Sequence, residues 1–285
     1  MTPRFEAYCR RKTEAALSAS IPGFRTAREE PAAATRLPVG NAWSCALFDG
    51  FFYRAIYDEQ RATPAMSLVF VQSRDGNTGT DDPSILGGGA TDKHLVYEGL
   101  SRIDADGVLA GATTARDDNL VFSVWHPELV RLRLDRGQRR HPAQIVLTDR
   151  GDLPIHRALM YNEPSLRVII ITSTPGAAVL RLRLPGREWI EVVDAGQPID
   201  LIRGMRELAA RGMRVVSAVG GRRAASALLR ERLVDDLYLT TSPRPGGEPD
   251  TPLYDGPALD ADLLLDKRGL GEDDGVRFQH DAIRR

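Results

Sequence analysis

Short, continuously apolar runs alternate with helical segments over most of this chain, and this alternation restricts the possible fold more than any other feature. Apolar residues recur with helical spacing in residues 92–103, 198–212 and 223–233. Strands that are apolar along their whole length are covered on both faces, and strands joined through helices run parallel. We therefore predict a three-layer α/β/α sandwich around a mixed, mostly parallel sheet. The predicted strands are residues 66–73, 107–111, 143–148, 167–173, 189–194, 214–220 and 236–242.

The start of the chain lacks this alternation, so we divide the chain into an N-terminal extension, residues 1–62, and a main domain, residues 63–285. Residues 276–283 predict an antiparallel edge strand of the main domain. Within the extension we expect an amphipathic helix at residues 6–19, a linker or extended wrap at 21–38, and a strand pair or edge element at 42–57.

The balance of charges excludes a general electrostatic attraction to polyanions. The 38 Lys and Arg residues and 39 Asp and Glu residues give a net charge of -1. We therefore expect no nucleic-acid or membrane partner, and any bound anion must be held by a local pocket. Cys9 and Cys45 are too few for a disulfide framework and lack zinc-site spacing, so no metal is expected. The charged N-terminus and the lack of a long apolar run predict a cytoplasmic protein.

Ligands of parallel sheets bind beyond the carboxyl ends of the strands, so the residues that follow three predicted strands are the candidates for function. Asp75 and Gly76 follow the first of these strands. An Asp-Gly pair can be only a turn, because aspartate bonds the local backbone and glycine accepts positive φ. Alternatively, Asp75 orients a polar substrate or transfers a proton, and we name it as the candidate catalytic residue.

The second strand end has the sequence GATTARDDN and begins at Gly111. Gly111 permits close approach of the backbone to a ligand, and Thr114 can cap the next turn beside a bound phosphate. Arg116 can pair with a phosphate through its two-pronged guanidinium group. Asp118 and Asn119 supply acceptors for ribose hydroxyls or a heterocycle. The alternative is a capped helix start with a solvated Arg–Asp pair.

The third strand end is Gly220-Gly221, which runs directly into a predicted helix. The glycines remove Cβ obstruction, and the helix N-terminus directs N–H groups outward. Arg222 or Arg223 can add positive charge. A glycine pair alone is a weak signal, but two strand ends suited to phosphate and one bearing an acid point to a shared ligand site.

Four segments together resemble the reductase domain of riboflavin biosynthesis, a member of the dihydrofolate-reductase-like superfamily. In chain order they are SRDGNTG, ADGVLAGATTARDDN, VGGRRAASALLRERLVDDLYLTTSP and GGEPDTPLYDG. The resemblance covers roughly residues 64–285. It implies a three-layer fold around a mixed sheet, NADPH as the hydride donor, a small-molecule substrate and a homodimer.

The resemblance and the residue chemistry together assign the candidate site. The substrate-side residues are Ser73, Asp75, Arg102 and Asn119, with Arg102 facing an anionic group of the substrate. The cofactor contacts are Val71, Gly111, Thr114, Arg116, Asp118, Gly220, Gly221, Arg222, Arg223, Ala224 and Ala225. Residues 86–99 contain three consecutive glycines and predict a mobile loop over the pocket. Lys93 and His94 are either pocket residues or a solvated helix start.

Two positions depart from the family pattern. Val219 precedes the glycine pair where the family usually carries glutamate, and Val124 and Trp125 stand near where it often carries arginine. The H-x-E and P-C-x-x-C motifs of the zinc deaminase often fused to this reductase do not occur. We predict an NADPH-dependent reductase that delivers hydride to a C=N or similar bond of a pyrimidine-like molecule, of the 5-amino-6-ribosylaminouracil phosphate type, or of a pterin-like one. The alternatives are dihydrofolate reduction and a non-catalytic nucleotide-binding module.

Overall fold

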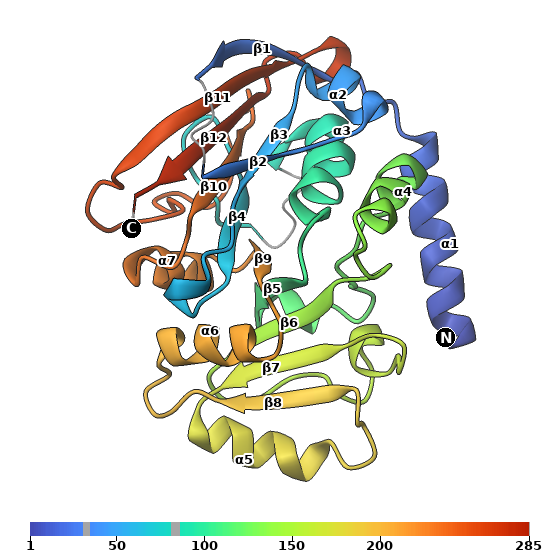
Figure 1. Ribbon diagram of the computed structural model, residues 1–285, viewed down its shortest axis with the longest axis vertical. Coiled ribbons are helices and arrows are strands. Elements are labelled where there is room, and N and C mark those ends of the chain that lie inside the picture. The colour runs from blue at the N-terminus through green and yellow to red at the C-terminus, as the bar shows by residue number, and fades with distance from the viewer. Residues whose placement is uncertain (31–34, 81–85, 285) are drawn as a thin grey trace.

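A computed structural model describes residues 1–30, 35–80 and 86–284, and a ten-stranded mixed sheet forms its centre (Figure 1). The strands are β1 (Phe24–Glu29), β4 (Ala65–Gln72), β5 (Gly107–Gly111), β6 (Ala143–Thr148), β7 (Val168–Thr172), β8 (Ile190–Asp194), β9 (Val215–Val219), β10 (Asp236–Thr241), β11 (Ala261–Gly269) and β12 (Arg277–Ile283). Their order across the sheet is β1-β11-β12-β10-β4-β9-β5-β6-β7-β8. The strands from β10 to β8 in this order are parallel, whereas β12, β11 and β1 pair antiparallel. All seven predicted strands are present, and the predicted fold class is confirmed.

Helices cover both faces of the sheet and complete the three layers (Figure 1). The helices are α1 (Pro3–Ser18), α2 (Ala42–Phe48), α3 (Gly89–Thr91), α4 (Pro127–Asp135), α5 (Thr174–Arg183), α6 (Leu201–Ala210) and α7 (Arg222–Arg230). On β7, Ile169 and Ile171 belong to the core under α6 and α7, whereas Val168 and Ile170 belong to the core on the other face. Each parallel strand is thus apolar on both sides. Of the described helices, none is long and apolar enough to cross a membrane.

The predicted N-terminal extension shares the central sheet. The predicted helix is present as α1. Residues 21–38 were predicted as a linker or an extended wrap; in the structure Phe24–Glu29 form β1, which pairs antiparallel with β11, β2 begins at Arg36, and residues 31–34 lie outside the described residues. Residues 42–57 are not a strand pair: they contain α2 and then β3 (Phe52–Ala55), which pairs with β2 (Arg36–Val39) in a separate two-stranded sheet. The boundary predicted at residue 63 therefore separates β1 from the other strands of its sheet. The division of the chain into an extension and a main domain stays a prediction.

One further expectation about secondary structure was wrong, and one strand was not predicted. The strand predicted at residues 276–283 is antiparallel, but β12 lies between β10 and β11 and is not at the edge. The sequence pattern also did not reveal β11, since charged residues interrupt its apolar run. Two of these, Asp266 and Lys267, are buried in the fold and have partners: Asp266 pairs with Arg277 at 2.8 Å, and Lys267 Nζ donates to Thr26 Oγ1 at 2.7 Å.

Asp236, at the start of β10, joins the two-stranded sheet of β2 and β3 to the central sheet. Its buried carboxylate accepts hydrogen bonds from Arg36 Nε at 2.8 Å and from the Ala55 backbone N–H at 2.6 Å, and it lies 2.8 Å from His280 Nε2. Burial opposes the ionisation of Asp236, but His280 and Arg36 outweigh this effect and hold its pKa below the usual range. The charged carboxylate therefore stabilises the folded protein.

Replacing Asp236 with alanine should lower the free energy of unfolding by about 3–5 kcal/mol at pH 7, because the largely buried Arg36 loses its counter-charge. Urea denaturation measures this change. Because the folded-state pKa of Asp236 is depressed, its stabilisation is present above the unfolded pKa of about 3.9 and is lost as the pH falls through the lower folded value. The Asp255→Ala variant is the control, since its exposed pair with Arg230 should contribute less than about 1 kcal/mol. Equal losses in both variants would contradict the assigned role.

Candidate active site

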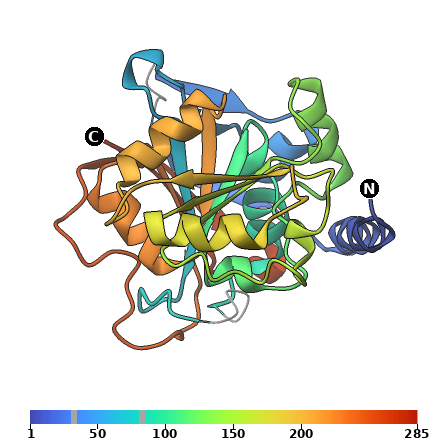
Figure 2. The ribbon, with the colours of Figure 1, turned by 90° about the horizontal axis from the view of Figure 1, so that it is seen from below.

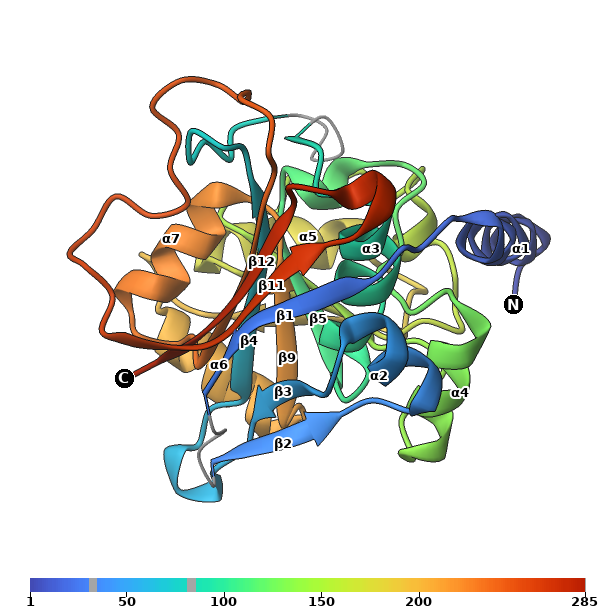
Figure 3. The ribbon, with the colours of Figure 1, turned by 90° about the horizontal axis from the view of Figure 1, so that it is seen from above.

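The three predicted strand ends meet at one edge of the sheet. β9 lies between β4 and β5 and is parallel to both, so the carboxyl ends of all three strands are neighbours. The segment after β4 and the long connection between β10 and β11 extend beyond this edge, at the top of Figure 3. A backbone hydrogen bond of 2.8 Å from Thr78 N–H to the Thr251 carbonyl joins these two segments. The carboxyl edge is therefore the candidate ligand site.

The carboxyl ends of β5 and β9 approach each other closely at this edge because both are followed or formed by glycine. A Cβ added to Gly221 would lie 3.3 Å from the Gly111 Cα, and one added to Gly220 would lie 2.9 Å from Thr114 Oγ1. Gly220 and Gly221 also have φ angles of +64° and +77°, which other residues adopt at a cost. Side chains at these positions would push the two loops apart.

The N-terminus of α7 opens onto this close contact. Gly221 is its N-cap residue and supplies no side-chain hydrogen bond, so the first N–H groups of the helix lack a side-chain cap. Arg222 and Arg223 are exposed beside these groups, whereas Ala224 and Ala225 are buried. Uncapped N–H groups, the helix dipole and adjacent arginines favour a bound anion. These residues fit a phosphate group of a dinucleotide.

The polar residues after β5 lie on an exposed turn. Arg116 is half-exposed and pairs with exposed Asp152 at 3.1 Å. The Asp118 carboxylate pairs with Arg157 at 2.9 Å, and Asn119 Oδ1 accepts a hydrogen bond from Arg4 at 3.1 Å. Exposed ion pairs of this kind are weak, so Arg116 can exchange Asp152 for a phosphate.

The turn after β4 has both a structural and a reactive candidate. Ser73 is buried, and its Oγ accepts a hydrogen bond from the Asn77 N–H at 3.2 Å, so its hydroxyl closes the turn. Asp75 is half-exposed near the tip, 3.9 Å from Arg74 Nε. The geometry is therefore compatible with both roles of Asp75, as a simple turn residue and as a residue that orients a substrate or transfers a proton.

Arg102 lies apart from the other site candidates. It precedes the amino end of β5, is 1% exposed, and donates from Nη1 to the Ser123 carbonyl at 2.9 Å. Its guanidinium carbon lies 4.4 Å from the centre of the Tyr97 ring. We therefore exclude Arg102 from the candidate active site. His94 is likewise buried, with Nδ1 3.6 Å from Glu98 Oε2, whereas Lys93 is exposed.

Asp92 is a candidate that the sequence analysis missed. Residues 86–99 were expected to form a mobile loop, but most of them are helical: α3 begins at Gly89 and continues into a π-helix, Asp92–Tyr97. π-Helical turns are frequent at functional sites. The Asp92 carboxyl accepts a hydrogen bond from Thr240 at 2.5 Å, near the carboxyl end of β10. An Asp at the start of a helix carries no sequence signal that separates it from an ordinary first-turn acid.

The environment of Asp92 favours its protonated form. Burial raises the pKa of Asp92, the Thr240 hydrogen bond lowers it, and nearby Asp273 raises it, and together they place this pKa at about 7. A Cβ added to Gly88 would lie 2.8 Å from Asp92 Oδ2 and 3.1 Å from Val71 Cγ2, so Asp92 is close to the end of β4. The site thus has a carboxyl group that can hold a proton near neutral pH.

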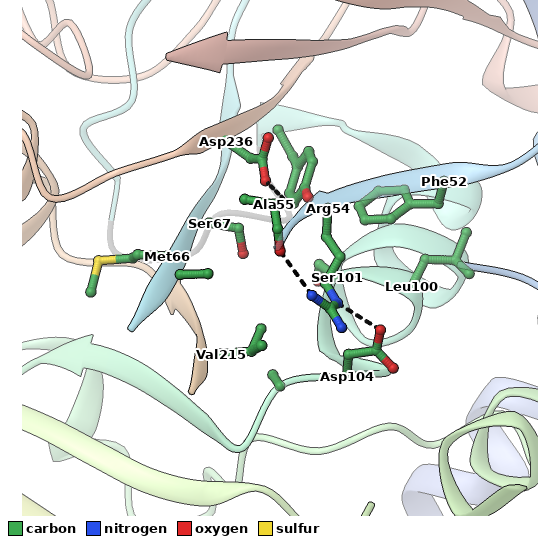
Figure 4. Close-up of a pocket in the computed structure, with 13 residues that line it drawn as sticks. Phe52, Arg54, Ala55, Met66, Ser67, Leu100, Ser101, Asp104, Val215 and Asp236 are labelled. Atoms are coloured by element: carbon green, nitrogen blue, oxygen red, sulfur yellow. Dashed lines mark hydrogen bonds and ion pairs between the residues drawn. The ribbon is translucent and has the colours of Figure 1, made fainter. Parts of the chain in front are cut away.

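Cavities lie at both edges of the sheet. At the amino edge, a narrow cavity lies between β3, the starts of β4 and β9, and residues 100–105 (Figure 4). Its charged residues already have charged partners, as in the 2.6 Å pair of Arg54 with Asp104. At the carboxyl edge, an open hollow lies beyond β6 and β7, lined in part by Asp149, Arg150 and Ser173. In the described parts of the chain, no group of three or more His, Cys, Asp or Glu side chains could hold a metal ion.

Comparisons with known proteins identify the family of this chain. The family model of the RibD C-terminal domain matches residues 64–273. The riboflavin biosynthesis protein RibD of Chlamydia muridarum is 27% identical over 214 residues, which are 74% of this chain but only 54% of that protein, so the chain spans about half the length of this curated relative.

Solved structures share the fold at lower sequence identity. A pyrimidine reductase-like protein from Corynebacterium diphtheriae has a TM-score of 0.65 and 22% identity, over 78% of this chain and 92% of that one. A diaminohydroxyphosphoribosylaminopyrimidine deaminase/5-amino-6-(5-phosphoribosylamino)uracil reductase from Thermotoga maritima has a TM-score of 0.53 and 16% identity, over 79% and 58%. The family match over most of the main domain, together with this shared fold, shows that the chain belongs to the RibD C-terminal domain family.

Proposed function

We propose that this chain is an NADPH-dependent reductase of a pyrimidine-like small molecule. The observation that carries the proposal is the uncapped N-terminus of α7 beside the Gly111–Gly221 contact, at the edge where three parallel strands end. The Thermotoga relative is named as a reductase of 5-amino-6-(5-phosphoribosylamino)uracil, which makes this compound the first substrate to test. We also propose a cytoplasmic homodimer, on the resemblance to the family.

The residues of the carboxyl edge divide into two groups in this proposal. The α7 N-terminus, Thr114 and Arg116 would hold the phosphates of NADPH, and Val71 and Asp118 would contact the rest of the cofactor. When bound, NADPH supplies the hydride. Asp75 and Asn119 would orient the substrate, and the protonated Asp92 would donate the proton that accompanies reduction of a C=N bond.

A second candidate function, reduction of a pterin-like molecule, is favoured by the apolar residues that replace the family's usual charges. Val219, Val124 and Trp125 are each no more than 1% exposed, so none of them can bind a sugar phosphate. A substrate without that phosphate would not need the missing charges. NADPH oxidation in the presence of dihydrofolate, but not of the phosphorylated pyrimidine, would favour this function.

The Gly221→Ala variant tests the proposed phosphate site. A methyl group there meets Gly111 and strains a backbone with φ of +77°, so the dissociation constant of NADPH should rise at least about tenfold, measured by fluorescence titration. The matched control is Gly212→Ala, which has a similar φ of +81° but no atom within 4 Å of the added Cβ. Both variants should lose about 1–2 kcal/mol of stability. Equal NADPH affinity in the two variants would refute the site.

The Arg116→Ala variant tests which phosphate Arg116 contacts. If Arg116 pairs with the additional phosphate of NADPH, the variant should lose roughly tenfold or more in NADPH affinity and little in NADH affinity, again by fluorescence titration. The control is Arg131→Ala on α4, an exposed arginine that pairs with Glu128 at 3.5 Å. Similar losses for the two dinucleotides would remove Arg116 from this role.

The Asp92→Asn variant tests the proton donor. Because the pKa of Asp92 is about 7, the wild-type kcat should fall as the pH rises above 7, where the carboxyl loses its proton. The variant should have a kcat lower by about 10²–10⁴-fold and should lack this pH dependence in steady-state NADPH oxidation. The Asp75→Asn variant is the comparison, and it should change KM while it keeps the pH dependence. Loss of that dependence in Asp75→Asn would instead assign the proton to Asp75.

A further inference from the structure

The N-terminal helix α1 lies outside the segment that matches the family, yet it contacts the loop that carries two of the proposed ligand residues. Figure 2 shows α1 end-on at one side of the sandwich. The Arg4 guanidinium donates to the Asp118 carbonyl at 3.0 Å, to Asn119 Oδ1 at 3.1 Å and to the Arg157 carbonyl at 2.8 Å. One side chain of α1 therefore holds three positions of the loops beyond β5 and β6.

Other contacts hold α1 itself in place. Thr2, its N-cap residue, donates from both N and Oγ1 to the buried Glu163 carboxylate, at 2.8 and 2.7 Å. The Tyr8 hydroxyl accepts from the Val121 N–H at 3.2 Å, and Lys12 Nζ lies 2.5 Å from Glu98 Oε1. The helix is thus anchored independently of Arg4.

The position of Arg4 does not serve helix stability. It is the second residue of α1, where the partial positive charge of the helix N-terminus disfavours a cation. Its side chain extends away from the helix to the loop, where it bonds two carbonyls and one amide oxygen. The Arg4 side chain therefore contributes to the structure through its contacts with the loop and not through the helix.

The contact with Arg4 determines which way the Asn119 amide faces. A guanidinium group only donates hydrogen bonds, so the amide oxygen must face Arg4 and the Nδ2 group must face elsewhere. The Asn119 backbone N–H is already bonded to Asp117 Oδ1 at 2.8 Å. Asn119 is exposed, and its Nδ2 has no partner among the described residues. The side chain therefore directs two donors away from Arg4, toward a ligand, while its amide oxygen faces Arg4.

We propose that Arg4 is a positioning residue that orients Asn119 to donate a hydrogen bond to an acceptor oxygen of the substrate. The inference rests on the proposed function and adds to it that Asn119 donates, and does not accept, the hydrogen bond to the substrate. Without Arg4, the amide can rotate and present its oxygen, which repels an acceptor. The N-terminal segment thereby supplies a determinant of substrate binding that the family-matched segment lacks.

Kinetics with NADPH and 5-amino-6-(5-phosphoribosylamino)uracil, together with hydrogen exchange of residues 112–122, test the proposal. Arg4→Ala should raise KM for the pyrimidine on the order of tenfold, with kcat and the NADPH dissociation constant within about twofold of the wild type. Exchange around Asn119 should become faster. The control, Arg11→Ala, removes an exposed arginine of the same helix and should match the wild type in every measurement.

Asn119→Asp separates orientation from loop order. The carboxylate still accepts from Arg4, so exchange should stay at the wild-type rate, but the donors are gone and KM should rise at least as much as in Arg4→Ala. If Arg4→Ala matches Arg11→Ala in both KM and exchange, the positioning role is refuted. If the wild type does not turn over the pyrimidine, the proposed function is refuted, and the exchange rates of Arg4→Ala alone then decide whether Arg4 holds the loop.

Discussion

The parallel strands of the central sheet are buried on both faces, and this burial decides the path of the chain. Alternate residues of β7, such as Ile169 and Ile170, lie in separate cores on opposite sides of the sheet. Each strand must therefore be followed by a chain segment that returns across a face before the next parallel strand begins. This requirement brings the carboxyl ends of β4, β9 and β5 to one edge, where their loops can share a ligand.

The two edges of the sheet have different tasks because their charged groups are differently occupied. At the amino edge, Asp236 and Asp104 are buried and paired with arginines of β2 and β3, so these ion pairs hold the two-stranded sheet to the central sheet. At the carboxyl edge, the α7 N-terminus is uncapped, and Arg116 has only an exposed partner. Groups with weak or missing partners are the ones available to a ligand, which is why the proposed function rests on this edge.

The carboxyl edge is also held from outside the family-matched segment. α1 reaches the loop after β5 through Arg4, and β1 adds a strand beyond β11. The close approach of Gly111 and Gly221 defines the phosphate end of the site, whereas contacts from α1 hold the Asp118–Asn119 end. A fold shared within the family can in this way gain contacts to its loops from an added helix, without change in the strands of the parallel sheet.

Local patterns in the sequence were enough to predict the seven strands of the parallel part of the sheet and the three strand ends that meet at its carboxyl edge, because apolar runs and the glycines that follow them are local signals. The arrangement of the N-terminal segment, β11 and three side chains is visible only in the folded molecule. Arg102 is buried at the amino edge, burial raises the pKa of Asp92, and Arg4 donates a hydrogen bond to Asn119 Oδ1. These depend on contacts between residues far apart in the chain, such as Thr240 with Asp92, and no local pattern records which distant residues will meet.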